Sequence, residues 1–125
     1  MKTTPPVACD VNVREARLDS WPLPAEAITR GRPDASGLVL AKSDDARVVR
    51  GIWASTPGQF RWSWTYDETI VVVSGRATVE LSDGRTVELM PGSLAFFERG
   101  LDSTWTIHEP FRKGFHALSP EPLPF

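Results

Sequence analysis

The feature that most constrains the fold of this chain is a succession of short, strand-like segments separated by turn signals. In QFRWSWTY (residues 59–66), every second side chain is aromatic and those between are polar or charged. This is the period of a β-strand with one buried face. About eight such segments follow one another from residue 47 to 118, with turn signals about every 8 to 12 residues. The spacing predicts an all-β sandwich or barrel, and no segment has the pattern of a long helix.

The two ends of the chain lack this rhythm. Residues 1–44 contain five prolines and one short apolar run, GLVLAK (residues 37–42), while residues 119–125 contain three prolines. Residues that precede a proline are biased towards extended geometry. We therefore expect an N-terminal arm with a short edge strand (1–44), a β-barrel (45–118) and a C-terminal tail (119–125).

Composition excludes several classes of partner. The chain has 125 residues and a formal net charge of −2, which gives no positive surface for nucleic acid or an anionic membrane. Its longest apolar run, IVVV (residues 70–73), is far too short to span a bilayer. The single cysteine, Cys9, allows no intrachain disulfide, and the N-terminus has no apolar signal-peptide core. We expect a soluble cytoplasmic protein.

Two spaced motifs resemble those of the cupin family. They are PG-x3-W-x-W-x3-E-x6-G (residues 57–75) and DG-x5-MPGS-x4-ERG (residues 83–100). More narrowly, the chain is similar, over roughly residues 18–118, to small single-domain cupins of the (S)-ureidoglycine aminohydrolase type. The resemblance implies an RmlC-like jelly roll, a double-stranded β-helix that is open at one end.

The positions that hold a metal in this family carry unsuitable side chains here. Aligned on the motifs, Trp62 and Trp64 occupy two histidine positions, Glu68 keeps the glutamate position and Ser103 occupies the third histidine position. An indole offers only an N–H donor, and a neutral serine is a poor ligand. A catalytic metal needs about three protein ligands. We therefore expect no metal and no other cofactor.

The aromatic residues in the motif region have two interpretations. Trp62, Trp64 and Tyr66 fall on one face of a predicted strand, and Trp105 follows the Ser103 position by two residues. These side chains are either a packed core or the wall of a pocket for a planar or cationic ligand. The sequence leaves both alternatives open.

Three charged or titratable residues also have alternatives. Glu68 is either a general acid or base, or a carboxylate bonded to turn amides or to an arginine. Lys113 is either a fixed cation in the cavity or a solvated charge at a strand end, and His116 lies on the last predicted strand, where it could face the barrel interior. The predicted ligand-binding set is Trp62, Trp64, Tyr66, Glu68, Trp105, Lys113 and His116.

The resulting functional prediction is a metal-free cupin that binds a small organic molecule in the barrel mouth. A ureide, an amine or an amino-acid-like compound is the expected ligand class. The first alternative is a ureidoglycine aminohydrolase-like hydrolase with a non-standard site, for which no catalytic residue is identified. The second is a dimerisation or regulatory module whose cavity is filled. The resemblance also implies a homodimer, in which the arm adds to a partner's sheet.

Overall fold

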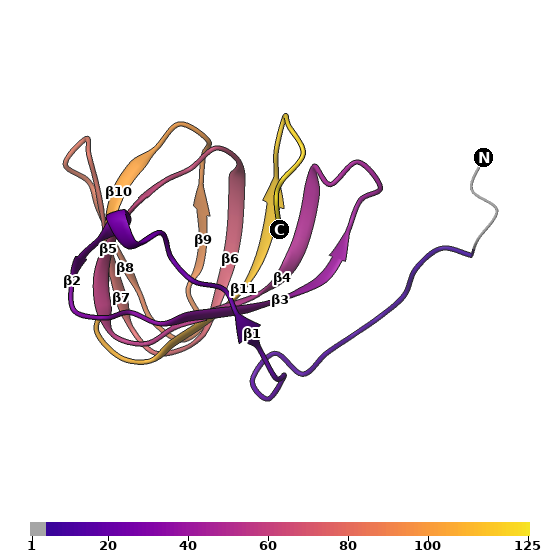
Figure 1. The fold of residues 1–125 in the computed structure, drawn as a ribbon, viewed down its shortest axis with the longest axis horizontal. Coiled ribbons are helices and arrows are strands. Elements are labelled where there is room, and N and C mark those ends of the chain that lie inside the picture. Colours follow the sequence, from indigo (N-terminus) through magenta and orange to yellow (C-terminus); the bar gives the residue numbers. More distant parts are fainter. Residues whose placement is uncertain (1–4) are drawn as a thin grey trace.

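The computed structural model describes residues 5–125 as a β-structure of two sheets (Figure 1). The elements are β1 (Asp19–Ser20), β2 (Ile28–Arg30), β3 (Ala35–Lys42), β4 (Val48–Ser55), β5 (Gly58–Ser63), β6 (Asp67–Ser74), β7 (Ala77–Leu81), β8 (Thr86–Leu89), β9 (Leu94–Phe97), β10 (Asp102–Ile107) and β11 (Phe111–Leu118). Within these residues the one helical element is a single 3-10 turn, η1 (Ala25–Ala27). No helix in the described range is long and apolar enough to cross a membrane.

The strand order is that of a jelly roll. One sheet has the order β1-β3-β4-β11-β6-β9 and the other β2-β5-β10-β7-β8, and all neighbouring strands are antiparallel. The last strand, β11, lies between β4 and β6, so the chain returns to the middle of a sheet that it began much earlier (Figure 1). The predicted all-β cupin fold is confirmed.

The core lies between the inner faces of the two sheets, and alternation along each strand selects its residues. On β11, Phe111, Lys113, Phe115 and Ala117 are buried, whereas the residues between them are partly exposed. Successive side chains of a strand point to opposite faces, so Lys113 faces the core. The register places Lys113 beside Trp53 of β4 on one side and Val72 of β6 on the other.

Both ends of the chain contribute to the barrel. Strands β2 and β3, which precede residue 45, belong to different sheets, and β1 pairs with β3 of its own chain. In the tail, the backbone N–H of Leu123 donates to the carbonyl of Ala46 at 2.8 Å, and the Leu123 side chain is buried. The final ring, Phe125, lies 5.2 Å from that of Trp21, centroid to centroid. The tail is thereby held against the barrel.

Candidate functional site

A cavity of about 50 Å³ lies between the two sheets and is enclosed mainly by aromatic rings. A single buried water needs roughly 10–15 Å³ by the same measure, so the space suits a few waters or a small organic group. The apolar walls include Trp21, Trp53, Phe60, Trp62, Trp105 and Phe115. Three side chains with polar groups also line it, Tyr66, Glu68 and Lys113.

A buried ion pair forms the polar part of this cavity. Nζ of Lys113 lies 3.0 Å from Oε2 of Glu68, and the two residues are only 6% and 4% exposed. Their strands, β11 and β6, are hydrogen-bonded neighbours, and both side chains are on inward-facing positions. The other carboxylate oxygen, Oε1, accepts a hydrogen bond of 2.9 Å from the indole N–H of Trp64. Both oxygens of Glu68 therefore have a donor.

Two indole rings enclose the Lys113 ammonium. Nζ lies 5.0 Å from the ring centroid of Trp53 and 5.0 Å from that of Trp105. A desolvated cation–π contact contributes roughly 2 kcal/mol. The aromatic rings and the carboxylate together stabilise a positive charge that would otherwise be costly in this apolar interior.

The indole N–H of Trp105 is a donor without an acceptor. Trp105 is 2% exposed and lines the cavity. Among the buried polar side-chain atoms of residues 5–125, Nε1 of Trp105 alone lacks a hydrogen-bond partner. Leaving such a donor unpaired costs about 1–3 kcal/mol, so native structures rarely do so without a ligand, a water or a functional reason.

The Tyr66 hydroxyl is held in its protonated form. Burial raises the pKa of Tyr66 well above its ordinary value of 10.0, and the negative charge of Glu68 raises it further, whereas Trp62 acts in the opposite direction. Because an ionised phenol would be poorly solvated beside a carboxylate, Tyr66 stays a neutral donor through the physiological range.

The predicted aromatic stripe divides between the core and the cavity wall. Trp64 is not among the cavity-lining residues; it is buried and stacks on Phe97, with ring centroids 4.4 Å apart and planes 8° apart. Trp62 is only partly buried and lines the cavity. The strand period brought these side chains to one face, but their depths differ because Trp64 follows the end of β5 and packs against β9.

The structure does not bring His116 to the cavity. His116 is partly exposed and alternates with Phe115 and Ala117, which are buried, so it lies on the outer face of β11. It is opposite Arg50 of β4 and Thr69 of β6. The prediction placed the residue on the correct strand but not on the inner face.

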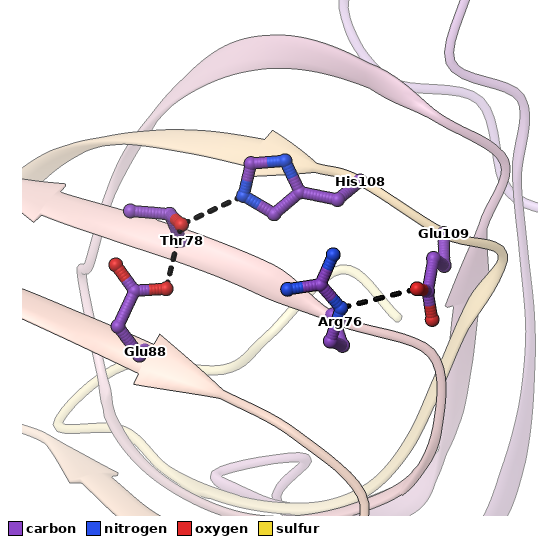
Figure 2. A network of polar contacts seen from close by, with 5 residues as sticks. All are labelled: Arg76, Thr78, Glu88, His108 and Glu109. Carbon is purple, nitrogen blue, oxygen red and sulfur yellow. Dashed lines mark hydrogen bonds and ion pairs between the residues drawn. The ribbon is translucent and has the colours of Figure 1, made fainter.

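The other histidine belongs to an exposed polar network on the second sheet (Figure 2). Nε2 of His108 lies 2.7 Å from Oγ1 of Thr78, which donates a hydrogen bond of 2.8 Å to Glu88. An ion pair of 3.1 Å between Arg76 and Glu109 lies beside them, with both side chains more than half exposed. These contacts connect the turn after β10 to β7 and β8 and are separate from the cavity.

Six cavity residues were absent from the predicted binding set, namely Trp21, Leu23, Trp53, Phe60, Phe115 and Phe125. Trp53 carries a usable signal, since the alternation along β4 gives it the same face as the buried Val49. Trp21 and Phe125 carry none, because both lie in proline-rich segments without periodicity.

A larger open groove of about 690 Å³ adjoins the cavity. The groove and the cavity share Leu23 and the rings of Trp21, Trp53, Trp62 and Phe125. Because these rings belong to both, they form the mouth of the cavity, and a ligand from solvent would pass between them.

The side chains at the positions that the motif resemblance assigns to metal ligands do not fit a transition metal. Trp62 and Trp64 offer no lone pair for coordination, and Oγ of Ser103 donates to the carbonyl of Trp62 at 2.9 Å. Glu68 is already bonded to Trp64 and to Lys113. Across residues 5–125, no group of three or more His, Cys, Asp or Glu side chains is arranged to hold a metal ion.

Solved structures share this architecture. A Pseudomonas syringae pv. tomato protein of unknown function from the DUF861 family matches with a TM-score of 0.76 and 22% identity, over 83% of this chain and 45% of that protein. The EutQ protein of Clostridium difficile matches with a TM-score of 0.62 and 22% identity, over 70% of this chain and 69% of that protein. A Thermotoga maritima DUF861 protein is 30% identical over 54% of this chain and 76% of that protein, with a TM-score of 0.53.

The coverage and the sequence identity of these matches limit what they show about this chain. This chain spans less than half the length of the Pseudomonas protein, and at 22% identity the likeness concerns the fold alone. A search among curated proteins gave no match. Residues 42–115, more than half of the chain, match the model of the EutQ-like cupin domain. The chain therefore belongs to the EutQ-like cupin domain family.

Proposed function

We propose that this domain binds a small organic molecule in the aromatic cavity and does so without a metal ion. The observation that carries the proposal is that Trp105, whose buried indole N–H has no hydrogen-bond partner, is one of the residues lining the cavity. A ligand with a carbonyl or similar acceptor would satisfy that donor and recover about 1–3 kcal/mol. Apolar walls with a few convergent polar groups are the usual composition of a small-molecule site.

The buried ion pair favours certain ligands. Lys113 and Glu68 together carry no net charge, yet they present a donor and an acceptor. A free amine would compete with Lys113 for Glu68, and a carboxylate would compete with Glu68 for Lys113. Separating a buried ion pair costs about 3–5 kcal/mol. A neutral ureide is therefore favoured over an amine or an amino-acid-like ligand.

A ligand screen with matched variants tests the proposal. Ureides, amines and amino acids would be added to the protein and binding followed by tryptophan fluorescence and thermal shift. Trp105→Phe removes the N–H but keeps an aromatic ring, so it should weaken binding at least about tenfold, the value of one hydrogen bond to a buried partner. Leu118→Ala is the control, since Leu118 is 48% exposed at the end of β11 and does not line the cavity. Binding that is unchanged in Trp105→Phe would refute the proposal.

Hydrolysis of a ureide is a second candidate function. One observation favours it: a buried carboxylate, Glu68, and a protonated phenol, Tyr66, line the same cavity. Such a pair can act as general base and general acid. Ammonia release from a bound ureide, lost in Glu68→Gln, would support hydrolysis, whereas saturable binding without product would leave the domain as a binding module.

A further inference from the structure

We propose that Lys113 is a carbonyl-reactive amine, which forms a Schiff base with a small aldehyde or ketone inside the cavity. The inference rests on the proposed function, since it uses the same cavity. It differs in chemistry, because it requires a covalent bond at one nitrogen atom, whereas the proposed function requires only reversible binding.

Lys113 is distinguished from the other amines of the chain by its surroundings. The sequence has three lysines, Lys2, Lys42 and Lys113. Lys42 is exposed at the end of β3, whereas Lys113 is buried against the cavity. Lysines used for Schiff-base chemistry are typically placed in such desolvated surroundings.

A proton acceptor is already in contact with the amine. Attack on a carbonyl requires a free lone pair on nitrogen, so a proton must leave Nζ. Oε2 of Glu68 accepts from Nζ at 3.0 Å, within the distance for direct proton transfer. Because both partners are buried, passing the proton removes two charges from an apolar site rather than creating them.

Two further groups suit the carbonyl oxygen. Trp105 lines the cavity and its buried N–H is an unused donor, which in this proposal stabilises the negative charge that develops on oxygen. Tyr66 also lines the cavity, and its hydroxyl remains protonated because burial and Glu68 raise its pKa. It can supply a proton when the oxygen leaves as water.

The reaction balances without an oxidant or a reductant. The lone pair of Nζ forms a C–N bond, the C=O electron pair moves to oxygen, and one proton shifts from the nitrogen to this oxygen to give a carbinolamine. The C–O bond then breaks as the oxygen takes the proton of Tyr66, which the protonated Glu68 replaces, so that water leaves, the nitrogen forms a C=N bond and Glu68 is again a carboxylate. The product is a protonated imine, whose charge matches that of the original ammonium.

The site is suited to the charge of this product. An iminium on Nζ would keep Glu68 as its counter-ion and would lie between the rings of Trp53 and Trp105, each now 5.0 Å from Nζ. The volume of about 50 Å³ limits the carbonyl compound to a few heavy atoms. Aromatic walls also restrict the water that would hydrolyse the imine.

Reductive trapping on the full-length, folded protein tests the inference. The protein would be incubated with propionaldehyde and sodium cyanoborohydride, and modified peptides would be quantified by mass spectrometry. We expect labelling of Lys113 to exceed that of Lys42 by at least about tenfold, because a positioned base and donor accelerate addition. Exposure alone predicts the reverse order, since Lys42 is the accessible amine.

Substitutions test whether the faster labelling of Lys113 depends on the cavity. Lys113→Arg keeps the positive charge and should abolish the fast adduct, whereas Lys42→Arg should leave it unchanged. Glu68→Gln and Trp105→Phe should each slow labelling of Lys113 while labelling of Lys42 stays constant. Circular dichroism would establish that each variant is folded. In urea the preference for Lys113 should disappear, because it depends on the folded cavity.

Two results would overturn the inference. The first is labelling of Lys42 at the same rate as Lys113, or faster, in the folded protein. The second is a preference for Lys113 that persists in urea, which would assign it to local sequence. With either result, the proposed function is still supported if fluorescence and thermal shift show that a ureide binds. Absence of ureide binding together with fast labelling of Lys113 would instead refute the proposed function and retain the Schiff base.

Discussion

The indole N–H of Trp64 donates a hydrogen bond of 2.9 Å to Oε1 of Glu68. The motif resemblance assigns these two positions to metal ligands, and here their side chains bond to each other. The second oxygen of Glu68 pairs with Lys113. A lysine ammonium thus supplies the positive charge that the carboxylate faces, and the carboxylate has no oxygen left without a donor.

Substitutions of the buried residues Glu68 and Lys113 should have strongly coupled effects on the free energy of unfolding. Removing one partner leaves an uncompensated buried charge, so Glu68→Gln or Lys113→Met should each lower the free energy of unfolding by about 3–5 kcal/mol. The double variant should lose clearly less than the sum of the two, because it leaves no such charge. Urea denaturation of the four proteins would give the coupling free energy.

An exposed ion pair provides the control for this cycle. Arg76 and Glu109 are more than half exposed, and their substitution should change stability little. Additive effects of Glu68→Gln and Lys113→Met would contradict a direct interaction between the buried side chains.

Replacing Trp64 by alanine should mainly reduce folding stability, whereas replacing Trp62 by alanine should mainly reduce ligand binding. Trp64 is buried and stacked on Phe97, so Trp64→Ala should cost about 3–5 kcal/mol of unfolding free energy. Trp62 is partly exposed at the cavity mouth, so Trp62→Ala should cost less and should mainly weaken ligand binding. Thermal melts and ligand titrations of both variants check this, and a larger loss of stability in Trp62→Ala would contradict it.

Alkaline pH should destabilise the protein through Tyr66. The pKa of this phenol is raised in the folded state, so above pH 10.0, its ordinary value, the unfolded chain loses the proton more readily than the folded one. The contribution of Tyr66 to the free energy of unfolding is fully present below that pH. Above it, this contribution falls by about 1.4 kcal/mol per pH unit until the phenol of the folded protein itself ionises.

The sequence contains one tyrosine, so the ultraviolet absorbance of the tyrosinate form reports on Tyr66 alone. Ionisation in the folded protein should occur only with unfolding, and Tyr66→Phe should reduce the alkaline loss of stability. A titration midpoint near 10.0 in the folded protein would show that the hydroxyl is solvated.

The fold and part of the site were accessible from the sequence for a clear physical reason. The two-residue period that places Phe60 and Trp62 inward is local, and turn residues mark where each strand ends. The same period applied to residues 111–118 identifies Lys113 as inward and His116 as outward, once the neighbours of each are known to be buried.

The contacts of the site were less accessible because they join distant strands. Glu68 and Lys113 are 45 residues apart, and they meet only because β11 inserts between β4 and β6. No local pattern encodes that insertion. The position of Phe125 is harder still, since a proline-rich tail has no period, and its place in the cavity wall depends on ring packing against Trp21 and on the hydrogen bond from Leu123 to Ala46.

A homodimer remains our expectation for solution, and the exposed apolar residues suggest where the copies meet. Leu94 and Phe96 of the edge strand β9 are 73% and 57% exposed, and Val71, the cross-strand partner of Leu94, is 48% exposed. An edge strand with apolar side chains is a template for pairing with another chain. Phe96→Glu should therefore shift the mass from dimer to monomer in light scattering.

Two comparisons sharpen this test. Leu118→Glu changes an exposed apolar residue on a different strand and should leave the mass unaltered. Deleting residues 1–18, which precede β1, tests the expected contribution of the N-terminal arm. A monomeric mass for the unmodified protein at micromolar concentration would exclude the dimer.

The ammonium of Lys113 also has a consequence for how the protein matures. A cupin that relies on a metal ion acquires its central charge after synthesis, from whatever the cell has in supply, and a chelator can remove it. In this chain the charge is part of the polypeptide and is in place when β11 closes the sheet. Every folded copy therefore has Lys113 in contact with Glu68, whatever the nutrients of the growth medium.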